Sequence, residues 1–63
     1  MLESATHRHF RIRIQRHLDY KKELKRQIER ATQELEIFSL ENELMVETVI
    51  VNFLRERLQK LAY

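Results

Sequence analysis

The clearest pattern in the chain is a run of helically spaced positions between Ile14 and Asn52, separated by alternating steps of three and four residues. This spacing aligns side chains in one stripe of an α-helix, as in the seam of a coiled coil. We call this stripe the first seam, and eight of its twelve positions are apolar. The positions are Ile14, His17, Lys21, Leu24, Ile28, Ala31, Leu35, Phe38, Asn42, Met45, Val49 and Asn52.

A second seam follows in the C-terminal half, and six of its seven positions are apolar. It is shifted from the first by two residues, which corresponds to about 200° around a helix and therefore to nearly the opposite face. Where the two overlap, the helix is apolar almost all round, which predicts contact with more than one neighbour. The second seam consists of Leu40, Leu44, Glu47, Val51, Leu54, Leu58 and Leu61.

Two all-α architectures explain the two seams. One is a continuous long amphipathic helix that contacts different partners on its two faces. The other breaks near residues 38–42 into a helical hairpin, with Ser39 as the N-cap of the second helix. The chain contains no glycine and no proline, and this lack of turn residues favours the continuous helix. In both cases we expect a coiled coil or a helical bundle.

The N-terminal residues give a weaker signal. Residues 1–9 are polar and basic, and we expect them to be frayed. Residues 10–62 are expected to form one helical assembly domain. Residues 9–14 alternate polar and apolar, as a half-buried strand would. Helix is the preferred interpretation, because Phe10, Ile14 and Leu18 also follow one helix face and strong helix formers continue the segment.

The length of the chain makes outside support necessary. A domain of 63 residues buries only about 60% of its unfolded surface, and scaffolds of this size usually need disulfides, a metal or a partner. The chain has no cysteine, so packing against other helices is the remaining source of stability. No apolar run reaches the roughly 20 residues that span a bilayer, and no signal-peptide pattern opens the chain. We therefore expect an intracellular protein, cytoplasmic or nuclear.

Charge is divided unevenly along the chain. Residues 1–30 hold nine Lys/Arg against four Asp/Glu, and residues 31–63 hold three against six. A parallel pair of chains would bring like charges together. Antiparallel pairing, or a hairpin, sets the basic half beside the acidic half. The charge pattern therefore favours an antiparallel arrangement.

No pattern of catalytic residues is present. Because the chain lacks glycine, it has no nucleophile elbow, phosphate-binding loop or dinucleotide fingerprint. The candidate metal ligands are His7, His9 and His17, and on a helix His7 and His9 point about 200° apart. We expect no enzymatic activity, no metal, no cofactor and no small-molecule substrate.

Nucleic acid is the alternative partner. The basic segment includes aromatic residues, and its order before a coiled-coil segment resembles the layout of leucine-zipper transcription factors. Residues 7–30 contain no asparagine, however, which those proteins use to meet the bases. A sequence-independent phosphate contact, or contact with an acidic protein, remains. The candidate residues are Arg8, Arg11, Arg13, Arg16, Lys22 and Arg26.

The function expected from these patterns is non-enzymatic assembly. The chain is expected to act as an oligomerisation or scaffold helix whose partners are further copies of itself or other helical subunits. The predicted interface residues are twelve of the fourteen apolar members of the two seams, namely Ile14, Leu24, Ile28, Leu35, Phe38, Leu44, Met45, Val49, Val51, Leu54, Leu58 and Leu61.

Overall fold

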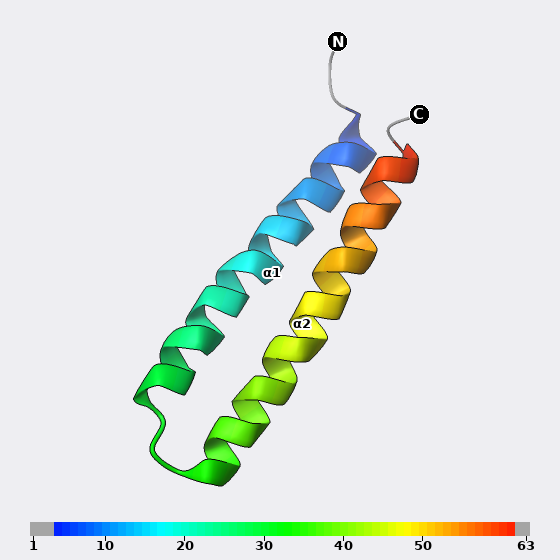
Figure 1. Ribbon diagram of the computed structural model, residues 1–63. Coiled ribbons are helices and arrows are strands. Elements are labelled where there is room, and N and C mark those ends of the chain that lie inside the picture. The colour runs from blue at the N-terminus through cyan, green and yellow to red at the C-terminus, as the bar shows by residue number, and fades with distance from the viewer. Residues whose placement is uncertain (1–3, 62–63) are drawn as a thin grey trace.

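The computed structural model describes residues 4–61 and consists of two helices that lie side by side and antiparallel (Figure 1). Helix α1 spans Ala5–Arg30 and helix α2 spans Glu34–Leu61. The pair forms a rod with a length of 49 Å. We call the end that holds residues 31–33 the loop end, and the end where α1 begins and α2 finishes the open end. The all-α prediction is confirmed, in its hairpin form.

Helix α1 begins with a side-chain cap that the sequence pattern did not reveal. The Ser4 hydroxyl accepts a hydrogen bond from the backbone N–H of His7 at 3.1 Å, which satisfies one of the free donors of the first turn. Residues 5–9, for which fraying is expected, therefore lie within α1, and residues 9–14 are helical rather than a strand. Residues 1–3 of the expected frayed segment, and residue 62 of the assembly domain, lie outside the described residues.

The helices separate at residues 31–33, not near residues 38–42. The continuous helix favoured from the sequence is therefore wrong, and Ser39 lies inside α2 instead of capping it. Ala31 adopts an extended backbone, and its N–H donates to the carbonyl of Gln27 at 2.9 Å and to that of Ile28 at 3.2 Å. No described residue has a positive φ, so this turn needs no glycine.

The charge sequence explains why the break lies there. Arg30 stands in the last turn of α1, and Glu34 and Glu36 stand in the first turn of α2. Cations are stabilised at the C-terminal end of a helix and carboxylates at the N-terminal end. The carbonyl of Gln33 accepts the N–H of Ile37 at 3.0 Å, which begins the hydrogen-bond ladder of α2.

The core lies along the contact between the two helices. Its most buried members are Ile14, Leu24, Val51 and Leu54, with 8%, 1%, 2% and 2% of their surface exposed. Ile14 packs in one cluster with Val51 and Leu54, and the partly buried apolar residues around them are Phe10, Leu18, Ile50 and Leu58. The α1 part of the first seam therefore covers the second seam within a single chain.

The small size of this core makes it sensitive to truncation. We expect Leu54→Ala to lower the free energy of unfolding by about 2–5 kcal/mol, because it removes a buried side chain and leaves a cavity. The matched control is Ile12→Ala, since Ile12 is 45% exposed and its change should cost less than about 0.5 kcal/mol. Urea denaturation followed by circular dichroism measures both. Equal losses of stability in the two variants would contradict this packing.

Candidate protein-interaction surface

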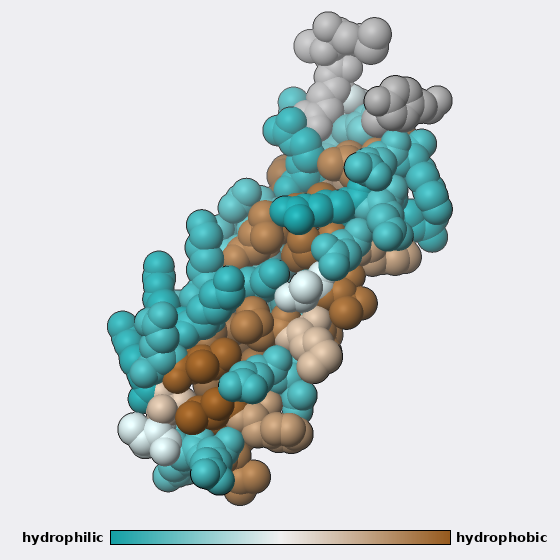
Figure 2. Space-filling view, viewed as in Figure 1, coloured by the Kyte–Doolittle hydropathy of each residue, from teal (hydrophilic) through white to brown (hydrophobic). Residues whose placement is uncertain are grey.

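Helix α2 exposes a second apolar face on the side that α1 does not cover. We call it the outer face of α2, and it includes Leu35, which at 83% is the most exposed large apolar side chain of the described residues. The outer face consists of Leu35, Phe38, Met45, Val46, Val49 and Phe53, each more than half exposed. Figure 2 shows apolar surface reaching solvent along α2. Apolar patches of this extent on a small protein commonly mark an interaction site.

The outer face follows directly from the sequence of α2. A helix that is apolar on one stripe is covered by one neighbour, whereas a helix that is apolar nearly all round needs several. Helix α1 is of the first kind, because its core residues Ile14 and Leu24 are buried while its other sides are mostly polar. Helix α2 is of the second kind and has one neighbour within the chain, so much of its apolar surface is uncovered.

The predicted interface residues divide into two groups in the structure. The first group is buried or partly buried within the hairpin and comprises Ile14, Leu24, Ile28, Leu44, Val51, Leu54 and Leu58. The second group is exposed and comprises Leu35, Phe38, Met45, Val49 and Leu61. Of the second group, all but Leu61, at the open end, belong to the outer face. Val46 and Phe53 also belong to this face, although they are not among the predicted interface residues. Val46 directly follows Met45, and Phe53 lies four residues after Val49. This spacing is the signal that identifies them.

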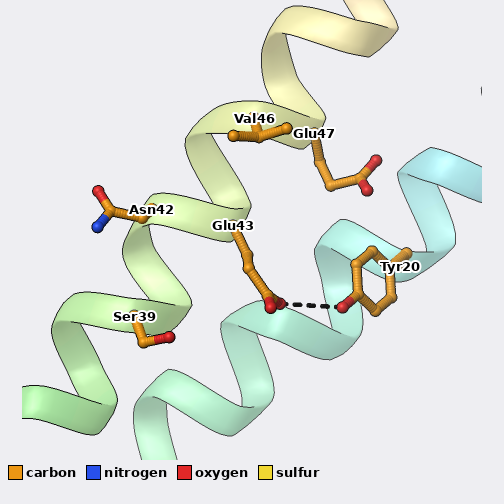
Figure 3. Close-up of a pocket in the computed structure, with 6 residues that line it drawn as sticks. All are labelled: Tyr20, Ser39, Asn42, Glu43, Val46 and Glu47. Carbon is orange, nitrogen blue, oxygen red and sulfur yellow. Dashed lines mark hydrogen bonds between the residues drawn. The ribbon is translucent and has the colours of Figure 1, made fainter.

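One polar position of the first seam pairs with the polar position of the second. His17 of the first seam contacts the carboxylate of Glu47 of the second through Nδ1, with 26% and 14% of the two side chains exposed. One turn nearer the loop end, the Tyr20 hydroxyl donates to Glu43 Oε2 at 3.0 Å (Figure 3). A shift of either helix by one turn would leave the partly buried His17 and Glu47 unpaired and would separate the exposed Tyr20 from Glu43. The two contacts therefore fix the register of the hairpin.

Two shallow grooves run between the helices. The groove nearer the loop end contains two carboxylates, and we call it the acidic groove. It is lined by Tyr20, Ser39, Asn42, Glu43, Val46 and Glu47. The groove nearer the open end contains two arginines, and we call it the basic groove. It is lined by Phe10, Arg13, His17, Val49, Ile50, Phe53, Leu54 and Arg57. His17 and Glu47, which contact each other, lie one in each groove, so the two grooves adjoin on one side of the rod.

The fold polarises charge along the rod. Among the described residues, the half at the open end (residues 5–17 and 50–61) contains seven Lys/Arg and one acidic residue, Glu56. The half at the loop end (residues 18–49) contains five Lys/Arg and eight Asp/Glu. The basic residues of the open-end half are Arg8, Arg11, Arg13, Arg16, Arg55, Arg57 and Lys60. One end of the rod is therefore strongly positive and the other negative.

The six candidate phosphate-binding residues are all exposed but do not form one cluster. Arg8, Arg11, Arg13 and Arg16 lie in the open-end half, where the C-terminal part of α2 adds further basic residues. Lys22 and Arg26 lie in the loop-end half, and Arg26 contacts Glu23 at 3.5 Å. The structure thus places four of the six in one half of the rod and the other two in the other half.

Neither helix of the described chain contains a stretch that is long and apolar enough to cross a membrane. Within residues 4–61, no three His, Asp or Glu side chains are grouped so that they could hold a metal ion. His7 and His17, two of the three histidines considered as ligands, instead contact Ser4 and Glu47.

The contact between Tyr20 and Glu43 has a measurable consequence. The hydrogen bond to the Glu43 carboxylate, followed by the negative charge of that group, raises the pKa of Tyr20 above its ordinary value of 10.0. A raised tyrosine pKa favours the neutral phenol in the folded chain, so this stabilisation is present at neutral pH and is lost as the pH rises through the pKa. Ultraviolet titration in a Tyr63→Phe background, where Tyr20 is the remaining tyrosine, should show a drop in this pKa on Glu43→Gln. An unchanged titration would contradict the register of the hairpin.

The chain was compared with known protein families, with curated proteins and with solved structures. No family model, curated protein or solved structure matches it. Its function must therefore be inferred from its own surface.

Proposed function

We propose that the protein is a non-enzymatic assembly module, a helical hairpin that joins other helices through the outer face of α2. The observation that carries this proposal is the exposure of six large apolar side chains on a helix whose opposite side is already packed. The chain acts either by self-association or as a small helical subunit of a larger complex.

The energetics of the hairpin support this role. Four residues of the described chain form its buried apolar core, which leaves a two-helix structure with little margin of stability. Burying one exposed Val, Leu, Phe or Met side chain contributes about 1.5–3 kcal/mol. Several such side chains together exceed the lower estimates for the cost of association, which begin at about 4 kcal/mol. Covering the outer face therefore stabilises both the hairpin and the assembly.

A charge placed in the middle of the outer face tests the proposal. We expect Met45→Glu and Val49→Glu to abolish association, because burial of an unpaired carboxylate is strongly unfavourable. Sedimentation equilibrium combined with circular dichroism over a dilution series measures association and helicity in the same samples.

The matched control is Gln15→Glu, which adds the same charge at an exposed position of α1 and should leave association unchanged. Wild-type protein that remains a folded, cooperatively melting monomer at every concentration would overturn the proposal. An isolated chain that is unfolded and monomeric would support the subunit role, because such a chain needs a partner to fold.

Contact with nucleic-acid phosphates is a second candidate function, favoured by the gathering of basic residues at the open end. Seven Lys/Arg from both helices lie in that half of the described chain. Binding to phosphates by such residues releases counterions and is therefore weakened by salt.

A salt titration tests this second function. If it is correct, the triple variant Arg8→Gln, Arg13→Gln, Arg16→Gln should make the slope of log affinity against log salt shallower on duplex DNA. The expected change is about 0.9 for every phosphate that the variant no longer neutralises. The control neutralises Lys22, Lys25 and Arg26 in the loop-end half. Equal effects of the two triple variants, or no binding at low salt, would reject a specific role for the open end.

A further inference from the structure

We propose that the partner of the outer face is a second copy of this chain, packed antiparallel so that the two α2 helices lie side by side between the two α1 helices. In this arrangement the loop end of each copy lies beside the open end of the other. The inference rests on the proposed function and adds the identity and orientation of the partner.

Charge along the rod selects both the partner and the direction. The open-end half of the described chain is strongly positive and the loop-end half is negative. Each end of one copy is therefore opposite in charge to the other end of a second copy. A parallel pair would place two positive ends together and two negative ends together. Like-charge juxtaposition of this kind is a strong selector of orientation. An antiparallel pair replaces both repulsions with attractions.

The same polarity exists along the outer face itself. At the loop end, Leu35 and Phe38 are flanked by Glu34, Glu36 and Glu41. At the open end, Phe53 is followed by Arg55 and Arg57 with Glu56 between them, and the guanidinium of Arg57 lies 5.2 Å from the centroid of the Phe53 ring. The apolar stripe therefore has an acidic border at one end and a basic border at the other.

Shape provides a second reason. Leu35 and Phe38 project from the loop end with 83% and 64% of their surfaces exposed. The basic groove at the open end is lined by apolar side chains, including Val49 and Phe53, and by two arginines. An exposed apolar pair bordered by carboxylates on one copy thus matches an apolar groove bordered by guanidinium groups on the other.

One alignment sets the acidic end of each outer face at the level of the basic end of the other. When two α2 helices run antiparallel with Phe38 level with Phe53 of the second copy, the sequence spacing sets Glu36 level with Arg55 and Glu34 level with Arg57. The two-fold axis then passes between Met45 and Val46, at the middle of the outer face. Each copy offers the same patch to the other, as a two-fold symmetric interface requires.

The size of the outer face is suited to such a dimer. Six side chains that are each more than half exposed present an apolar area on the order of several hundred Å², compared with the roughly 800 Å² that each partner contributes to a standard interface. The walls of the two grooves supply the polar border of the contact. The outer face therefore supplies the apolar centre of such an interface rather than the whole of it.

Distances between labels on the two copies test the orientation. The chain has no cysteine, so single cysteines introduced by Gln33→Cys at the loop end or Gln59→Cys near the open end carry spin labels at known sites. Both positions are exposed and lie off the outer face. In the antiparallel dimer, a mixture of the two variants should give a short distance between unlike labels. Samples with one variant alone should give long distances that approach the 49 Å length of the rod.

Charge exchange tests the complementarity. Glu34→Arg with Glu36→Arg, and separately Arg55→Glu with Arg57→Glu, should each weaken self-association by about tenfold or more at low salt. An equimolar mixture of the two double variants should restore association, because each positive end again meets a negative one. Failure of the mixture to associate, while the wild-type chain does so, would overturn the charge argument.

The outcomes separate this inference from the proposed function. Association through the outer face with short distances between like labels overturns the antiparallel arrangement and leaves the assembly role intact. An unfolded monomer overturns the second copy as partner and supports a different helical subunit. A stable folded monomer overturns both. Concentration-dependent association, abolished in Val49→Glu and showing the antiparallel distances, supports both.

Discussion

The structure depends on one imbalance: α2 carries more apolar surface than a single neighbouring helix can cover. Helix α1 buries one stripe of α2 around Val51 and Leu54, and this contact is what holds the hairpin together. The opposite stripe, which includes Phe38 and Val49, stays exposed. Because the hydrophobic effect scales with the apolar area removed from water, the same composition that forms the hairpin also leaves it incomplete. Intramolecular folding and assembly are in this sense two parts of one burial process.

Polar groups decide which helix pairing is used. Apolar stripes alone tolerate sliding by a helical turn, because one Leu or Val replaces another at nearly the same position. The pairing of His17 with Glu47, reinforced by that of Tyr20 with Glu43, removes that freedom, since a shifted register leaves the partly buried His17 and Glu47 without partners. His17 and Glu47, which weaken their seams when each is considered alone, are complementary when the seams meet. They give the hairpin its specificity rather than its stability.

The sequence predicts the helical content and both seams, but places the turn wrongly. The first seam continues across the turn through Leu35 and Phe38, which hides the break. The second seam can be extended back to Ile37, which is partly buried, and this extension indicates that the new phase begins just after residue 33. The change from Arg30 to Glu34 is a second signal, since it matches the preferences of a helix end and a helix start. Glycine is not a signal here, because no described residue needs a positive φ.

The orientation of assembly could not be deduced from the division of charge between the two halves of the sequence. The hairpin already sets the basic half beside the acidic half, so this asymmetry is largely satisfied within one chain and says little about a second one. What the fold leaves unbalanced is the charge along its length, because the first turn of α1 and the last turn of α2 meet at one end of the rod. Arg13 of α1 and Arg57 of α2 thus come to line one groove, although they are far apart in sequence. The direction in which copies pair is therefore a property of the folded rod, and the loop at residues 31–33 creates it by folding the chain back on itself.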